Sequence, residues 1–185
     1  VRFRTGDFQK GKSFFAMLRS EITQDKIVSL NKRYRAGDQG LIQDIGYINE
    51  SDPVYNINSF YHWSRSLKEK TYNIMYGGGV SYARTISYLT DDQNASLQNN
   101  VNALGFDKGI NNNTTLTQML FFRYNPSENF EINPGVRYNY TWTSSTLPAF
   151  AAANTQKIIP NVIGSVNLTP TTIFGADLSK EFNTG

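Results

Sequence analysis

Three groups of residues have types or spacings that occur in ligand-binding, metal-binding or catalytic sites. Gly77-Gly78-Gly79 suggests a loop that cradles phosphate. A phosphate-binding loop needs a Lys and a Ser or Thr after its last glycine, followed by a helix, whereas Val80-Ser81-Tyr82 continues a strand pattern. We therefore interpret the glycines as places where neighbouring strands approach closely or where a bulky neighbour needs room.

The other two groups concern metals and acid–base chemistry. His62 beside Trp63 could act as a base or a ligand, but it is the single histidine and there is no cysteine, so a metal site would need carboxylates from elsewhere. Asp91-Asp92 with Asn94, and Asn111-Asn112-Asn113 nearby, could bind calcium in a long loop, but their spacing does not match a known calcium loop. We predict no catalytic residues, no metal, no cofactor and no enzymatic activity.

Composition narrows the class of protein further. The chain has 185 residues, enough for one domain, and 18 Lys+Arg against 15 Asp+Glu. The first 84 residues hold 13 basic and 8 acidic side chains, a modest and scattered excess that does not predict nucleic-acid binding. With 12 Phe, 11 Tyr and 2 Trp the chain is not a disordered tail. No apolar run reaches the ~18 residues of a membrane-spanning helix, but a membrane-spanning β-barrel remains open.

The period of the apolar residues predicts the fold class. In Phe130–Thr143 every even position is apolar or aromatic and none of the odd ones is, which is the pattern of a two-faced strand. At roughly 3.3 Å per residue and ~40° tilt this strand would cross the hydrocarbon core of a bilayer. Similar rows occur in Ile74–Tyr88, Leu116–Tyr124, Ile158–Leu168 and Phe174–Phe182, and weaker ones in Val54–Ser66 and between Lys12 and Ile48.

The connections between these strands alternate in length. Short ones are expected at Gln24–Lys26, Leu67–Lys70, Pro126–Asn129 and Thr169–Thr171, and long ones at Ala36–Asp52, Asp91–Asn113 and Ser145–Thr155. We predict an all-β protein: a segment of about eight strands of an antiparallel transmembrane β-barrel, with short periplasmic turns and long extracellular loops. Residues 1–185 are read as part of one barrel domain of a longer protein, with Val1–Phe8 arriving as a loop and with Lys12–Thr23 and Thr172–Gly185 as open edges.

The middle of the chain resembles a known family. Val54-Tyr55-Asn56-Ile57-Asn58-Ser59-Phe60-Tyr61-His62-Trp63-Ser64-Arg65, followed by a charged turn and a long aromatic strand with Ser87-Tyr88-Leu89, resembles large outer-membrane barrels of the TonB-dependent-receptor type. So do the strand–turn–strand unit Phe121–Ile132 and the flanking runs Gln9–Lys12 and Gln24–Ile27. The resemblance implies uptake of a ligand across the outer membrane of a Gram-negative bacterium, with a plug domain, TonB, and a surface lipoprotein or complex subunits as partners.

Within this hypothesis the two faces of the strands have different roles. Candidates to face the lumen are Glu131, Asn133, Arg137, Asn139 and Thr141. Candidates to face lipid or to form the aromatic girdle are Tyr82, Tyr88, Val136, Tyr138, Tyr140 and Trp142. Membrane lipid and lipopolysaccharide would contact the outer surface.

Two alternatives remain open at this point. The first is an outer-membrane barrel that does not transport, either a complete eight-stranded one or a scaffold in a surface complex. The second is a soluble carbohydrate-binding β-sandwich, whose strands should be only ~5–6 residues long.

Overall fold

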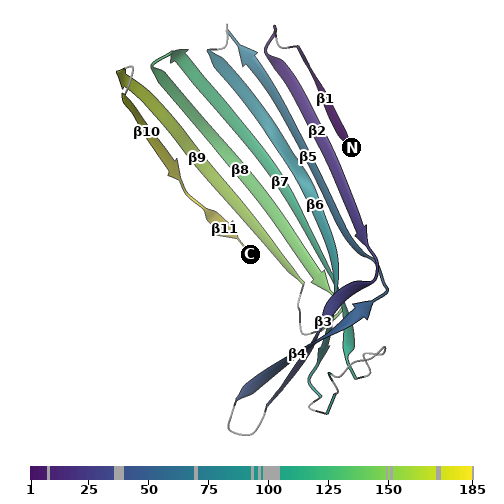
Figure 1. The fold of residues 1–185 in the computed structure, drawn as a ribbon. Coiled ribbons are helices and arrows are strands. Elements are labelled where there is room, and N and C mark those ends of the chain that lie inside the picture. The colour runs from purple at the N-terminus through teal and green to yellow at the C-terminus, as the bar shows by residue number, and fades with distance from the viewer. Residues whose placement is uncertain are drawn as a thin grey trace.

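The computed structural model describes residues 1–7, 9–35, 40–68, 71–92, 94–95, 97, 105–148, 150, 152–169 and 172–184. All regular elements in this part of the chain are strands (Figure 1). They are β1 (Arg2–Asp7), β2 (Lys12–Thr23), β3 (Lys26–Arg35), β4 (Leu41–Glu50), β5 (Val54–Leu67), β6 (Tyr72–Thr90), β7 (Asp107–Ser127), β8 (Phe130–Ser145), β9 (Ala153–Thr169), β10 (Thr172–Ser179) and β11 (Phe182–Thr184).

The strands form one wide antiparallel sheet in the order β1-β2-β5-β6-β7-β8-β9-β10, with β11 also paired to β9. The hairpin β3–β4 is inserted between β2 and β5 in the sequence and projects from one end of the sheet (Figure 1). It is joined to the sheet by a short parallel pairing of β3 with β6, where Leu30 is the partner of Tyr88. The prediction of an all-β, antiparallel chain is therefore confirmed.

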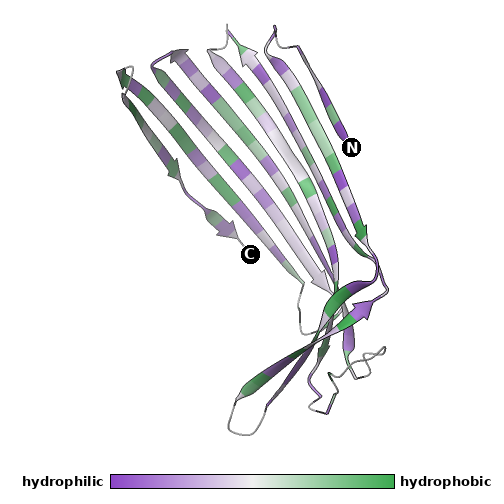
Figure 2. Ribbon diagram, viewed as in Figure 1, coloured by the Kyte–Doolittle hydropathy of each residue, from purple (hydrophilic) through white to green (hydrophobic). Residues whose placement is uncertain are grey.

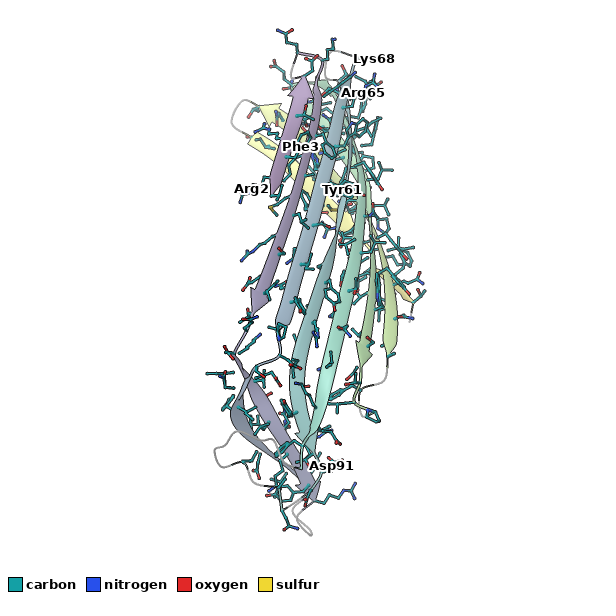
Figure 3. The ribbon with its side chains drawn as sticks, turned by 90° about the vertical axis from the view of Figure 1, so that its right-hand side faces the viewer. Arg2, Phe3, Tyr61, Arg65, Lys68 and Asp91 are labelled. Carbon is teal, nitrogen blue, oxygen red and sulfur yellow. The ribbon has the colours of Figure 1, made fainter. Side chains whose placement is uncertain are left out.

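The alternation of short and long connections is also confirmed. The links β1–β2, β5–β6, β7–β8 and β9–β10 are short and lie at one end of the sheet, near Arg65 and Lys68 in Figure 3. The links β2–β5, β6–β7 and β8–β9 are longer and lie at the other end, near Asp91. Below, these are called the short-turn end and the long-connection end. Gln24–Lys26 is a short connection as predicted, since β2 ends at Thr23 and β3 begins at Lys26. Its expected place was wrong: it lies at the long-connection end and leads into the projecting hairpin, because β2 pairs with β5 and not with β3.

The strand count and several boundaries were also wrong. The sheet has eleven strands rather than eight. Arg2–Asp7 was expected to be a loop but pairs with Lys12–Met17 over its whole length. Leu41–Glu50, assigned to a long loop, is a regular strand, and Asp107–Asn113 belongs to β7. The run of asparagines there is held between β6 and β8, and this pairing on both sides outweighs its low strand propensity.

The sheet is not closed into a barrel. The last strands, β10 and β11, pair with β9, and β2 pairs with β1 and β5. Direct pairing between Lys12–Thr23 and Thr172–Phe182, which a complete eight-stranded barrel requires, does not occur in the described residues. The sheet edges at β1 and β10 are therefore separate (Figure 1).

The sheet is a single layer over most of its length. The buried apolar residues gather at the long-connection end, where Leu30, Ala95 and Phe106 form a small cluster with Ile48, Tyr88 and Leu97 against it. Among the described residues no large side chain is completely buried. A sheet ordinarily buries an apolar face against a second layer. In the part of the chain that the structure describes, the central region of this sheet has no such layer over its apolar face.

Candidate functional site

The strand register divides the sheet into two chemically different faces. Side chains of directly paired residues lie on the same face, and successive residues alternate between the faces. Through their partners Met119, Thr117 and Thr115, the predicted lumen residues Arg137, Asn139 and Thr141 share one face. This surface, which also carries Glu131 and Asn133, is called the polar face below. Tyr82, Val136, Tyr138, Tyr140 and Trp142 lie on the opposite surface, called the aromatic face.

The aromatic face exposes most of the large apolar side chains. Examples along three neighbouring strands are Val80, Leu120 and Val136, which are 40%, 48% and 37% exposed. The alternation appears in Figure 2 as hydrophobic and hydrophilic bands along the strands. From Tyr72 to Tyr82, Thr114 to Tyr124 and Phe130 to Trp142, the positions on this face carry no charged side chain. An uncharged, exposed apolar surface of this extent is unusual for a protein in water.

Aromatic residues flank the aliphatic part of this face at both ends. At the short-turn end the Tyr72 and Tyr124 rings stack with centroids 5.0 Å apart, Phe122 and Phe130 pack against them, and the Lys68 ammonium lies 5.7 Å from the Tyr72 ring. Towards the long-connection end the rings of Tyr140 and Trp142 are 5.3 Å apart. There the Tyr82 hydroxyl donates to Asn112 at 2.8 Å, and Arg84 lies over the Tyr55 ring.

The separation of the two aromatic groups is the same on two strands. Tyr72 and Tyr82 on β6 are ten residues apart, and so are Phe130 and Tyr140 on β8. Ten residues span about 33 Å along a strand. A strand tilted by ~40° would then separate the aromatic groups by about 25 Å in height, the height of the apolar band of outer-membrane barrels.

One polar residue interrupts the apolar rows, and it has partners. Gln118 lies between Leu116 and Leu120 on the aromatic face. The hydroxyls of Tyr61 and Tyr76 both donate to its side-chain oxygen at 2.6 Å, one from β5 and one from β6. Gly78 is the strand partner of Gln118, and a Cβ there would lie 3.0 Å from the Gln118 amide atoms. A Cβ at Gly78 would also lie 2.4 Å from the Thr117 carbonyl oxygen, so the glycine allows β6 and β7 to approach closely here.

The polar face has a hollow near the short-turn end. Its wall is largely apolar, with Met75, Met119 and Phe121, and its volume is about 390 Å³. At its edge the Arg123 guanidinium forms an ion pair with Glu131. The Asn133 amide donates to the same carboxylate at 2.6 Å. Of the predicted lumen residues, Glu131 and Asn133 thus meet here, whereas Arg137 lines a separate, smaller hollow with Asp177 and Ser179.

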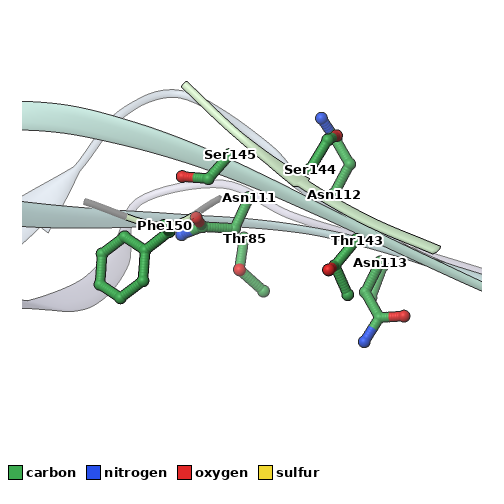
Figure 4. A pocket seen from close by; sticks show the side chains of 9 residues that line it. Thr85, Asn111, Asn112, Asn113, Thr143, Ser144, Ser145 and Phe150 are labelled. Atoms are coloured by element: carbon green, nitrogen blue, oxygen red, sulfur yellow. The ribbon is translucent and has the colours of Figure 1, made fainter. Parts of the chain in front are cut away.

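A larger hollow of about 690 Å³ lies on the polar face near the long-connection end. Its polar-face lining comes from Thr85 on β6, Asn111 and Asn113 on β7, and Thr143 and Ser145 on β8. In Figure 4 the Phe150 ring lies beside Thr85 and Asn111, while Ser144 and Asn112 point to the opposite side. The described lining contains hydroxyls, amides and an aromatic ring but no charged group.

Charged residues gather where the projecting hairpin meets the sheet. Glu50 is 4% exposed, and Lys108 Nζ lies 3.0 Å from its carboxylate and 2.7 Å from that of Asp52. The hydroxyl of Tyr88 donates to Glu50, so this predicted girdle residue is half-buried under the hairpin. Burial alone would raise the pKa of Glu50, but hydrogen bonds from Tyr88, the Asp52 amide and Lys108 outweigh it and lower the pKa. Sequence reasoning missed this cluster because its members lie up to 58 residues apart.

The residues first considered for chemistry lie apart from one another. Gly77-Gly78-Gly79 is extended within β6, and His62 lines the apolar hollow near the short-turn end. Asp92 accepts a hydrogen bond from the Asn94 amide at 2.9 Å, a local turn contact. Within the described ranges no group of three or more His, Asp or Glu side chains is close enough to hold a metal ion.

Comparison with protein-family models, curated proteins and solved structures finds no match. Across the described residues there is no helix of the length and apolarity needed to cross a membrane.

Proposed function

We propose that the sheet is part of the wall of an outer-membrane β-barrel, and that this barrel takes up a ligand across the outer membrane of a Gram-negative bacterium. The observation that carries the membrane proposal is the aromatic face: an uncharged apolar band between two aromatic groups about 25 Å apart in height. The central part of the described sheet is a single layer, so its apolar face is not covered by a second protein layer. In a membrane, lipid would cover this face.

Strand length also supports this proposal over a soluble sandwich. Strands β6, β7, β8 and β9 have 19, 21, 16 and 17 residues. Strands of a soluble sandwich are typically about 5–6 residues long, whereas a tilted strand needs roughly 9–11 to cross the hydrocarbon core. The extra length places strand ends beyond the bilayer, where the short-turn end would face the periplasm and the long-connection end the cell surface.

The uptake role rests on the resemblance to TonB-dependent receptors. In this proposal the open edges at β1 and β10 pair with the remainder of the barrel, because a bare sheet edge is costly in lipid. A plug domain would fill part of the lumen, TonB would supply the energy, and lipopolysaccharide would meet the surface end. A surface lipoprotein or other complex subunits would bind at that end.

Site-specific labelling tests the membrane proposal. The sequence has no cysteine, so single replacements can be labelled cleanly. We suggest Val80→Cys and Leu120→Cys on the aromatic face, with Ser81→Cys and Thr117→Cys as controls on the polar face, each carrying an environment-sensitive fluorophore in isolated outer membranes. Quenching by spin-labelled lipid at the first pair, and by aqueous iodide at the second, is expected. Iodide quenching of equal strength at all four positions would refute the proposal.

The uptake role needs a separate test. A strain without the gene and the complemented strain can be compared on a panel of single nutrients, with and without a protonophore. Growth on at least one nutrient that depends on both the gene and the proton gradient is expected. If the membrane labels behave as proposed and growth is equal on every nutrient, the barrel serves a non-transporting role in the envelope.

A further inference from the structure

The uncharged hollow at the long-connection end belongs to a longer surface, which we call the neutral track. It consists of four successive cross-strand rows on β6, β7 and β8. The two rows nearest the long-connection end are Thr85, Asn111 and Ser145, then Ala83, Asn113 and Thr143. The next two rows are Ser81, Thr115 and Thr141, then Gly79, Thr117 and Asn139.

Every side chain of the neutral track is either small or a neutral hydrogen-bonding group. Amides and hydroxyls can each donate and accept, so they suit a ligand that presents both kinds of group. The track ends at the next row, where Arg137 pairs with Met119. Two of the charged side chains at the flanks of the track form ion pairs: Arg19 lies 3.3 Å from Glu21 and Lys157 lies 2.7 Å from Glu181. Arg33 lines the adjoining hollow that shares Phe150, outside the four rows of the track.

Much of the hydrogen-bonding capacity of the track is available to a ligand. The side chains of Asn113, Thr117 and Asn139 make no hydrogen bond to another described residue. Thr115 and Thr141 share one bond of 3.0 Å and keep acceptor capacity. Ala83 is a small member of the track, and the hollow that it lines has the volume of an ordinary ligand site.

The chemistry of the track excludes two classes of ligand. An anionic ligand would find no cation among the track residues to offset its desolvation. An apolar ligand would cover these half-buried and exposed amides and hydroxyls and leave them without partners, at a cost for each of them. Phe150, which is 47% exposed beside Thr85 and Asn111 (Figure 4), offers a flat apolar surface at the open end. A ligand that combines neutral hydroxyls with an apolar ring face matches both features.

From these observations we infer that the neutral track binds a neutral carbohydrate, with the chain of sugar hydroxyls lying across β6–β8 and one sugar ring against Phe150. The inference deepens the proposed function, on which it rests, by naming the class of the ligand. The track runs from the long-connection end towards the middle of the polar face, the direction that a solute entering from the cell surface would take.

Binding of defined oligosaccharides to the intact protein in detergent tests this inference. The probes are hexasaccharides of neutral α-glucan, β-glucan, mannan and xylan, with hexagalacturonate as the anionic comparison, measured by titration calorimetry. At least one neutral probe should bind, and hexagalacturonate should bind more weakly. Asn113→Leu and Thr117→Val should each weaken that binding about tenfold. Each variant removes a side-chain hydrogen-bonding group from the track, so one sugar hydroxyl in the complex loses its partner.

Thr114→Val is the matched control, since Thr114 lies between these two positions but on the aromatic face. It should leave the affinity unchanged, and all three variants should show the same unfolding temperature. The inference is wrong if no neutral probe binds, if hexagalacturonate binds as tightly, or if Thr114→Val weakens binding as much as the track variants. The lipid-quenching experiment is independent of any sugar, so it would still report whether the sheet spans the membrane.

Discussion

Lys108 on β7 and Glu50 on β4 form an ion pair of 3.0 Å between the sheet and the projecting hairpin. The carboxylate of Glu50 is buried and also accepts from Tyr88 and, at 2.9 Å, from the Asp52 amide. Together with the three residue pairs between β3 and β6, these contacts hold the hairpin against the long-connection end of the sheet.

The first prediction is that docking of the hairpin weakens in acid. The pKa of Glu50 is lowered in the folded protein from an ordinary value of 4.5. The carboxylate therefore stabilises the docked hairpin above about pH 4.5, and this contribution is lost as the pH falls through the lower folded value. Hydrogen exchange of β3 and β4 amides, corrected for the intrinsic pH dependence, should show increasing opening below pH 4.5.

Glu50→Gln should remove this pH dependence. It should also lower the local free energy of opening by about 1.5–3 kcal/mol, the usual contribution of a hydrogen bond to a charged group. Glu21→Gln is the control, since Glu21 is exposed and pairs only with Arg19 in the described part of the chain. An equal change in both variants would show that Glu50 has no special role in docking.

The second prediction concerns the two faces of β8. Val136→Arg should lower the free energy of unfolding in lipid by about 2–4 kcal/mol, because a charged side chain would lie in the middle of the apolar band. Asn139→Arg should change it little, because Asn139 is on the polar face. Denaturant titration in vesicles measures both variants, and similar losses would contradict the assignment of the faces.

The third prediction concerns the partners of Gln118. Gln118→Leu should destabilise the protein by about 1–3 kcal/mol, because the hydroxyls of Tyr61 and Tyr76 lose their shared acceptor on an apolar surface and keep only the 3.2 Å hydrogen bond between them. Adding Tyr61→Phe and Tyr76→Phe should restore most of the loss, since no polar group is then unpaired. A triple variant less stable than Gln118→Leu alone would contradict this account, because it would mean that the hydrogen bond between the two hydroxyls satisfies them without Gln118.

The fourth prediction concerns sidedness. A protease cleavage site inserted after Asp92, at the long-connection end, should be cut in intact cells. The same site inserted after Glu128, in the turn between β7 and β8, should be cut only after the outer membrane is broken. Cutting at Glu128 in intact cells would reverse the proposed topology.

The sequence by itself determined the fold class and the two faces. The strict alternation in Phe130–Thr143 is a local property of the chain, because a strand turns successive side chains to opposite faces whatever it pairs with. The same reasoning correctly grouped Glu131, Asn133 and Arg137 on one surface and Val136 and Tyr138 on the other. Turn-forming residues likewise marked three of the four short connections, since their backbone preferences act within a few residues.

Only the tertiary structure decided which strands are neighbours. Thr23 and Lys26 are close in sequence, yet β2 pairs with β5 about thirty residues later, and β3–β4 leaves the sheet. The asparagines of β7 are extended because they pair with β6 on one side and β8 on the other. Glu50 meets Lys108 only because the fold brings the hairpin β3–β4 against the end of β7. Register between distant strands depends on the fit of whole faces, and neither propensity nor turn chemistry carries that information.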